Sequence, residues 1–247
     1  MFIIIDGIDG SGKSTAVQTW KDYLTGEGNA IFDLKHYWQT VGKYPELDEL
    51  KSYDFIFSCE PTYVGIGKVI REELIKNKTN YPPRAIVEAF SLDRLISYNK
   101  IIIPSLKNGK VIIQDRGVST SLAYQSISRS EAGSRRGGTE QDLTFKKIAD
   151  FPGNKLALEN RPDHLVIAKI SAEKAMARLQ NRFSKNDNAI FEQLRFQKKA
   201  AEIFYSPKYQ AIFTSKGAKI HYLNADAKID IMKQESINLL KTLINHS

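Results

Sequence analysis

Residues 7–14 are the part of the chain whose types and spacing point most directly to chemistry. They read Gly-Ile-Asp-Gly-Ser-Gly-Lys-Ser, which fits the phosphate-binding pattern G-x-x-x-x-G-K-[ST]. Glycines let consecutive backbone N–H groups converge on a phosphate, Lys13 brings a positive charge to the β- and γ-phosphates, and Ser14 offers its hydroxyl to Mg²⁺. The pattern predicts an ATP-binding loop made of Gly7, Asp9, Gly10, Ser11, Gly12, Lys13, Ser14 and Thr15.

Such a loop needs a strand before it and a helix after it, and the flanking sequence predicts both. The apolar run 2–6 is typical of a buried strand, and Val17, Trp20 and Leu24 recur at helical spacing beyond the loop. Kinases, GTPases, ATPases and motor proteins all use this loop. The rest of the chain must therefore decide the reaction.

Strand-like and helix-like patterns alternate along all 247 residues. We expect strands over 2–6, 30–34, 54–58, 111–114, 164–170 and 218–223, and the longest helix over 84–106. This alternation predicts one α/β domain over 1–247, a P-loop NTPase three-layer α/β/α sandwich around a mostly parallel sheet of about five strands. Two segments, near 35–53 and 126–160, are interpreted as insertions into that domain.

Composition narrows the classes of partner. The single cysteine, Cys59, excludes an internal disulfide framework and suits a reducing compartment. The apolar runs have only the length of a strand, so we expect a cytoplasmic protein with no membrane partner. A net charge of +8 favours anionic ligands. Because Lys and Arg are spread along the chain instead of forming one block, we expect no nucleic-acid partner.

Three further segments, taken together with the loop, carry a family resemblance. Glu60-Pro61-Thr62 precedes Arg71, Asp93-Arg94 lies within the long helical pattern, and Asp115-Arg116 closes a strand. With residues 6–15, these segments resemble the thymidylate kinase family specifically over residues 1–125 and weakly beyond them. The resemblance implies ATP-dependent phosphorylation of dTMP to dTDP in dTTP biosynthesis, with Mg²⁺ as cofactor. A homodimer is a further expectation from the family.

On the acceptor side, the resemblance implies that Asp9 accepts a hydrogen bond from the sugar 3′-hydroxyl and that Arg94 clamps the monophosphate. Arg71 would contact the base, Arg116 would steady the acceptor, and Glu60 would join the outer shell of the metal. The implied acceptor-binding set is Asp9, Glu60, Arg71, Arg94, Tyr98, Asn99 and Arg116.

On the donor side, the resemblance implies that Ser14 and Asp115 hold Mg²⁺. A lid near 171–190 would cover ATP, and Arg178 or Arg182 would neutralise charge on the transferred phosphoryl group. The implied catalytic set is Lys13, Arg94, Asp115, Arg116, Arg178 and Arg182.

Several of these side chains also have an ordinary structural interpretation. Arg94 could form an ion pair with Asp93 or Glu88 within its own helix. Arg71 could be an inert surface arginine, and Glu60 could cap the next helix. The two lid arginines could belong to a solvated basic helix.

Cys59 departs from the family pattern, because many members carry an arginine directly before Glu-Pro. A cysteine at this position removes an expected contact with the phosphate. Lys35, Arg94 or a lid residue could make that contact instead, or the acceptor could differ from dTMP. Three rival functions stay open. One is a deoxynucleoside kinase, which would need Glu60 as its base, and another is a kinase of a different nucleoside monophosphate. The third is a non-enzymatic P-loop protein that binds nucleic acid or has a regulatory role.

Overall fold

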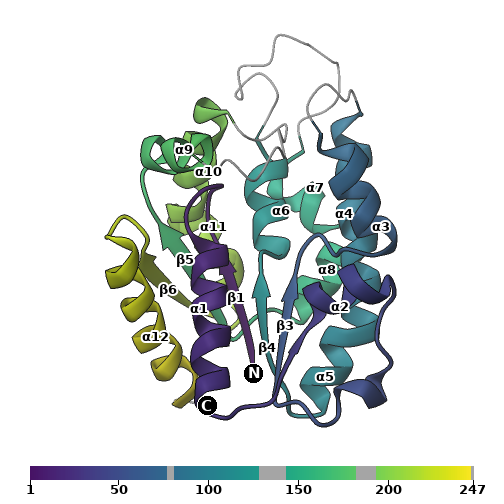
Figure 1. The fold of residues 1–247 in the computed structure, drawn as a ribbon. Coiled ribbons are helices and arrows are strands. Elements are labelled where there is room, and N and C mark those ends of the chain that lie inside the picture. Colours follow the sequence, from purple (N-terminus) through teal and green to yellow (C-terminus); the bar gives the residue numbers. More distant parts are fainter. Residues whose placement is uncertain (77–80, 128–142, 182–192, 246–247) are drawn as a thin grey trace.

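A computed structural model describes residues 1–76, 81–127, 143–181 and 193–245 of the chain. At its centre is one sheet of six parallel strands in the order β2-β3-β4-β1-β5-β6 (Figure 1). The strands are β1 (Phe2–Asp6), β2 (Ile31–Asp33), β3 (Phe55–Cys59), β4 (Val111–Asp115), β5 (His164–Lys169) and β6 (Lys219–Asn224). The predicted fold class is confirmed, and the short β2 brings the sheet to six strands.

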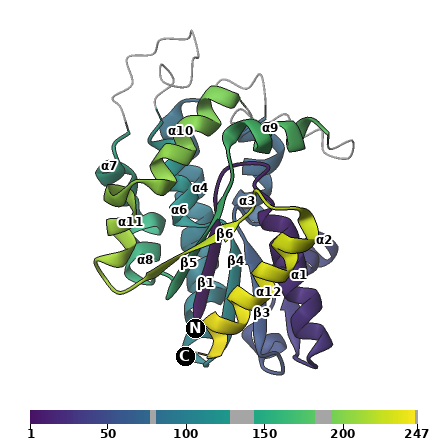
Figure 2. The ribbon, with the colours of Figure 1, turned by 90° about the vertical axis from the view of Figure 1, so that its left-hand side faces the viewer.

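Helices cover both faces of this sheet. They are α1 (Lys13–Gly26), α2 (Leu34–Val41), α3 (Gly65–Val69), α4 (Pro83–Ser97), α5 (Ile103–Lys107), α6 (Val118–Gln125), α7 (Phe145–Ala149), α8 (Pro152–Glu159), α9 (Ala172–Gln180), α10 (Leu194–Tyr205), α11 (Pro207–Thr214) and α12 (Ile229–Asn245). Both views show α1 beside α12 on one face, with α4, α6, α8, α10 and α11 on the other (Figures 1 and 2). None of the helices in these described ranges is long and apolar enough to cross a membrane.

The two apolar layers explain why the central strands are apolar throughout. Along β1, Phe2 and Ile4 belong to the layer under α4, α6 and α10, whereas Ile3 and Ile5 belong to the layer under α1 and α12. Both sets are 1% exposed or less. A strand covered on both faces needs apolar side chains at every position instead of at alternate ones.

The long helix predicted over 84–106 contains a wider turn. Its helical path runs from Pro83 through α4, a π-helical segment at Tyr98–Ile102, and α5. A π turn places one extra residue in the helix and changes which side chains face inward. Tyr98, Ile101 and Ile102 are all fully buried in this segment, whereas Leu92 in α4 is 45% exposed.

Residues predicted to bind or react lie at the carboxyl ends of the strands, along one edge of the sheet. The phosphate loop follows β1, Asp115 ends β4, and Cys59 ends β3 directly beside Asp115 in the strand register. Ligands of open parallel sheets bind beyond this edge. The fold therefore brings together residues that lie far apart in the sequence.

Candidate active site

The phosphate loop joins β1 to α1 and closely approaches α9. Gly10 has a φ of 77°, in the left-handed region that favours glycine, and a Cβ on it would collide with the carbonyl oxygen of Ala175. A side chain at Gly7, where φ is 140°, would lie 2.8 Å from the carbonyl oxygen of Ala168. Glycine is thus required at both positions, because any other residue would strain the backbone and its Cβ would collide with a carbonyl oxygen.

Lys13 is folded into the loop that it closes. Its Nζ donates to the carbonyl oxygens of Gly7 (2.9 Å) and Ile8 (2.7 Å) and to Ser11 Oγ (3.2 Å), and the residue is 5% exposed. Burial, and then the charge of Arg116, lower the pKa of Lys13 to about 8. An anionic phosphate would stabilise the charged ammonium that burial disfavours.

Ser14 and Asp115, the two predicted metal ligands, are in contact. Ser14 Oγ donates to Asp115 Oδ2 at 3.2 Å. The other carboxylate oxygen, Asp115 Oδ1, is buried and has no hydrogen-bond partner within the described ranges. A hydroxyl beside a carboxylate with an unsatisfied oxygen is a donor set that Mg²⁺ prefers, and a metal ion with its waters would satisfy that oxygen. The residues fit the expected cation.

Asp9 of the phosphate loop is paired with two side chains from other parts of the chain. Arg116, which follows β4 with a φ of 67°, forms an ion pair with it and lies over the Tyr124 ring at 5.6 Å. Gln197 of α10 donates to Asp9 Oδ2 at 2.9 Å and accepts from the Asp9 backbone N–H at 2.9 Å. Burial favours the neutral acid, but Arg116 and Lys13 outweigh it and hold the pKa of Asp9 below its usual value.

Asp6 is a second carboxylate that ties the loop to the site. It is fully buried and accepts hydrogen bonds from the hydroxyls of Ser119 and Thr120 in α6 and from the Gly7 N–H. Burial raises the pKa of Asp6 above its ordinary value. The three donors fix the start of α6 against the first residue of the phosphate loop.

Arg94 and Glu60 form a buried ion pair beneath this edge. Arg94 Nη2 lies 2.5 Å from Glu60 Oε2, and the side chains are 1% and 4% exposed. The guanidinium also donates to Asn154 and to Ser121 Oγ (2.9 Å), so all three of its nitrogens are engaged. Burial raises the pKa of Glu60, and Arg94 opposes that shift.

The predicted alternatives for Arg94 and Glu60 are wrong. Glu88 is paired with Arg84 at 2.9 Å, and Asp93 accepts from the N–H (2.8 Å) and hydroxyl (2.7 Å) of Thr62. The Arg94 guanidinium is therefore paired with the Glu60 carboxylate. Glu60 belongs to this buried ion pair and does not cap a helix. Whether Arg94 clamps a phosphate stays a prediction.

The three predicted base contacts lie in three different environments. Arg71 donates to the carbonyl oxygen of Thr62 at 3.0 Å, and its guanidinium carbon lies 3.9 Å from the centre of the Tyr63 ring, so it is not an inert surface side chain. Tyr98 is fully buried against Phe2, with ring centres 6.1 Å apart. Asn99 is exposed and donates to the carbonyl oxygen of Leu95 at 2.8 Å. The structure does not bring these side chains together.

The predicted lid is described only as far as α9. Ser171 caps this helix, because its hydroxyl accepts from the Lys174 N–H. Arg178 Nη1 donates to the carbonyl oxygen of Ala225 at 2.8 Å and lies beside Gly12 of the phosphate loop. Arg182 lies outside the described residues.

Comparison with known proteins identifies the family. A sequence profile described as thymidylate kinase matches residues 46–236. The chain belongs to the thymidylate kinase family. The profile makes it a phosphotransferase, of a family that generally uses ATP and a divalent metal ion.

Several thymidylate kinases are similar to this family member over most of their length. A probable thymidylate kinase of Thermococcus onnurineus is 29% identical over 209 residues, covering 82% of this chain and 81% of the relative. The thymidylate kinase of Mycoplasmopsis pulmonis is 28% identical over 234 residues, covering 87% and 85%. That of Bacillus velezensis is 25% identical over 243 residues, covering 97% and 94%.

Within this thymidylate kinase family member, Cys59 lies at the end of β3 and is 8% exposed. Burial raises the pKa of its thiol to about 11, and Sγ lies 3.9 Å from Arg71 Nη2. The thiol is therefore neutral at physiological pH and supplies no positive charge. The cation expected at this position from the family resemblance must come from elsewhere or be absent.

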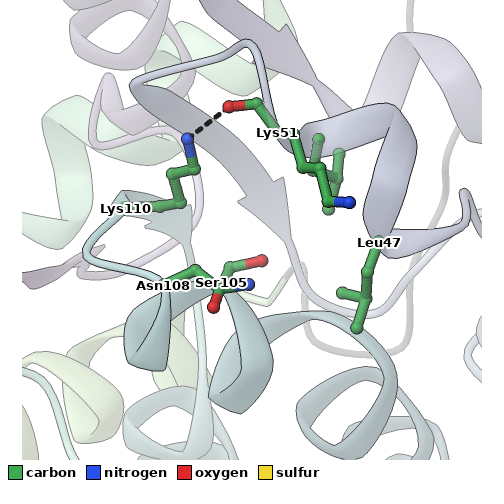
Figure 3. Close-up of a pocket in the computed structure, with 6 residues that line it drawn as sticks. Leu47, Lys51, Ser105, Asn108 and Lys110 are labelled. Carbon is green, nitrogen blue, oxygen red and sulfur yellow. Dashed lines mark hydrogen bonds between the residues drawn. The ribbon is translucent and has the colours of Figure 1, made fainter.

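A cavity of about 280 Å³ lies at the opposite edge of the sheet. It is formed between the 3₁₀ turn Leu47–Leu50 and the end of α5, and its lining is Leu47, Leu50, Lys51, Ser105, Asn108 and Lys110 (Figure 3). Lys110 Nζ donates to the carbonyl oxygen of Lys51 at 2.7 Å across it. It contains none of the predicted site residues, so it is separate from the phosphate loop.

Gln197 and Asp6 are two of the residues at this site that were not predicted from the sequence. Gln197 lies on the buried face of α10 with Phe196, Ala200 and Phe204. A fully buried glutamine among apolar side chains needs partners, and this is the signal that the sequence contained. It could not indicate that the partner would be Asp9, which lies 188 residues away.

Proposed function

We propose that this protein transfers the γ-phosphoryl group of ATP to the 5′-phosphate of dTMP with Mg²⁺, producing ADP and dTDP. The observation that carries the proposal is the pairing of Asp9. It belongs to the phosphate loop, yet its carboxylate is bound by Arg116, which follows β4, and by Gln197 of α10. The same loop would then contact two ligands. Its N–H groups would bind the phosphates of ATP, and the Asp9 carboxylate would lie beside the acceptor nucleotide.

The reaction needs little covalent help from the protein. An oxygen of the dTMP phosphate is already anionic, so it attacks the γ-phosphorus without a base, and the bond to the β–γ bridging oxygen breaks to release ADP. Lys13 and the loop N–H groups hold the donor phosphates, and Arg178 lies at the edge of the loop. Mg²⁺ held through Ser14 and Asp115 would neutralise charge on the β- and γ-phosphates.

The state of Glu60 argues against the deoxynucleoside kinase alternative. Phosphorylation of a 5′-hydroxyl would need a carboxylate free to accept the proton. Both oxygens of Glu60 already accept from Arg94, and Oε1 also accepts from Gln114. A carboxylate committed in this way is a poor base, whereas an anionic phosphate acceptor needs none.

Turnover with a panel of acceptors tests the proposal. ADP release would be measured with ATP and Mg²⁺ in the presence of dTMP, thymidine, dUMP, dCMP, AMP or GMP. We expect dTMP to be the best acceptor and thymidine to be inactive. Activity on thymidine alone would support a deoxynucleoside kinase, and a preference for another monophosphate would correct the acceptor.

A Lys13→Ala variant is the control for contaminating kinases, because it should remove the activity. If no monophosphate stimulates ADP release and the protein binds DNA in a salt-sensitive manner, the enzymatic proposal fails in favour of a nucleic-acid-binding protein.

A further inference from the structure

The inserted segment near 35–53 brings a lysine to the acceptor side of the site. The strand that directly precedes this segment, β2, pairs in parallel with β3, so that Asp33 lies beside Phe57 and the two strands end at the same edge. Lys35 follows in the first turn of α2. Its Nζ lies 5.5 Å from the centre of the Tyr63 ring, beyond the end of β3.

The charge of Lys35 is not neutralised by the carboxylate nearest to it in sequence. Asp33 is occupied on both oxygens, by Lys21 Nζ at 2.5 Å and by the His36 N–H at 3.2 Å. Over the part of the chain that the structure describes, the Lys35 ammonium has no hydrogen bond or ion pair, and the residue is exposed. It is a cation on a flexible stem that is free to take an anionic ligand.

A second cation adjoins the same aromatic ring. The Arg71 guanidinium carbon lies 3.9 Å from the ring centre of Tyr63. Both Lys35 and Arg71 act electrostatically on the Cys59 thiol, lowering its pKa against the larger effect of burial and against the carboxylates of Asp115 and Asp33. Two like charges around one ring and one strand end repel each other, and an anion between them would relieve that repulsion.

The other arginines of this side are already committed. All three nitrogens of the Arg94 guanidinium donate to protein groups and the side chain is 1% exposed, while Arg116 is paired with Asp9. We infer that Lys35 binds the phosphate of the acceptor nucleotide and supplies the positive charge that Cys59 cannot. This inference rests on the proposed function, because it takes a phosphate monoester as the acceptor.

The inserted segment holds the backbone of Lys35 in place while its side chain stays free. Trp38, one turn further along α2, is 1% exposed, and its ring meets Tyr44 edge-to-face at 5.8 Å. Tyr44 in turn lies beside Thr62, whose hydroxyl donates to Asp93 at 2.7 Å. The insertion is therefore packed against the same Glu60–Thr62 segment that borders the acceptor side.

Binding measurements with dTMP and thymidine isolate the phosphate contact, because the two ligands differ only by the phosphate. Calorimetry would be done on the wild type, Lys35→Ala, Lys35→Arg and Lys51→Ala. Lys51 is a matched control, since it is a lysine of the same segment, its side chain is 72% exposed, and it forms an exposed ion pair with Asp48. Steady-state KM values for dTMP and ATP would be measured on the same proteins.

We expect Lys35→Ala to weaken dTMP binding by roughly 10- to 100-fold, the usual range for one charge-assisted hydrogen bond. Thymidine binding and the KM for ATP should stay within about twofold, and Lys35→Arg should keep most of the dTMP affinity. Lys51→Ala should resemble the wild type.

Unchanged dTMP affinity in Lys35→Ala, or equal losses for dTMP and thymidine, would overturn the inference while leaving the proposed function intact. A wild-type protein that binds and phosphorylates no thymidine monophosphate would instead overturn the proposed function itself. Circular dichroism of each variant excludes misfolding as the cause, because Lys35 is exposed and its removal leaves no buried group unpaired.

Discussion

The donor and acceptor sides of the site are built in different ways. The donor side is one continuous loop, in which Lys13 is bonded to carbonyl and hydroxyl oxygens of its own segment. The acceptor side is assembled from β3, α4, the loop after β4 and α10, and its carboxylates are paired with cations from other elements. The first arrangement is local, whereas the second joins distant segments and depends on the whole fold.

That difference predicts different consequences of mutation. Residues on the acceptor side should affect stability as well as activity, since their charges are buried and mutually satisfied. Residues on the donor side should affect the reaction with little effect on folding. The predictions that follow test this contrast.

The largest effect is expected at the buried pair of Arg94 and Glu60. Arg94→Ala should lower the free energy of unfolding by about 3–5 kcal/mol, because it leaves a buried carboxylate without its cation. Urea unfolding measures this, and Arg84→Ala is the matched control on the same helix, where the exposed pair with Glu88 should contribute less than about 1 kcal/mol.

A double variant separates the missing cation from lost packing. Glu60→Gln combined with Arg94→Met should recover part of the stability, since no unpaired charge remains. Equal stability losses in Arg94→Ala and Arg84→Ala would contradict the buried pair.

The next effect is on the donor side. Lys13→Ala should lower kcat by about 100- to 1,000-fold, the loss seen when one group that stabilises a developing charge is removed. The free energy of unfolding should change by less than the Arg94→Ala variant changes it. Turnover and urea unfolding on the same protein give both numbers. A large loss of stability with normal kcat would reverse the contrast between the two sides.

A smaller effect is expected where the two sides meet. Gln197→Ala should reduce kcat/KM for dTMP by about tenfold, because Asp9 loses two hydrogen bonds of roughly 0.5–1.5 kcal/mol each. Gln193→Ala is the control, an exposed glutamine at the start of the same helix whose side chain makes no cap hydrogen bond. If both variants lose the same activity, α10 acts only as general support.

The smallest expected effect is a change in the protonation of Lys13 when a nucleotide binds to the donor side. The pKa of Lys13 is about 8 in the free protein, so part of the population is uncharged above that pH. Bound phosphate favours the charged form, and nucleotide binding at pH 8.5 should therefore take up protons. Calorimetry with a non-hydrolysable ATP analogue in buffers of different ionisation enthalpy measures this uptake, which should decrease at pH 7 and in Lys13→Ala.

The same contrast explains what could be predicted from the sequence. The phosphate loop, its flanking strand and helix, and the contact between Ser14 and Asp115 follow from short patterns and from the rule that parallel strands end at one edge. The α/β sandwich follows from the alternation of apolar patterns. The loop and its flanking elements depend on neighbours in the sequence, whereas Asp115, 101 residues from Ser14, reaches the loop because parallel strands end at one edge.

The acceptor side could not be predicted as well, because its contacts join distant segments. Arg94 was expected beside a phosphate or paired with Asp93 or Glu88, and only the fold places Glu60, 34 residues earlier in the sequence, beside its guanidinium. Tyr98 faces the core because a π turn shifts the helical register, which a 3.6-residue period cannot anticipate. The role of Gln197 depends on a contact across 188 residues.

The two helices that flank residues 182–192 have a consequence for the order of events. The preceding helix, α9, places Arg178 beside the phosphate loop, and the following helix, α10, places Gln197 on Asp9. Each of these two helices thus contributes a side chain to one of the two proposed nucleotide positions. If these contacts couple the positions, the coupling is thermodynamically reciprocal: the factor by which ATP changes the affinity for dTMP is also the factor by which dTMP changes the affinity for ATP.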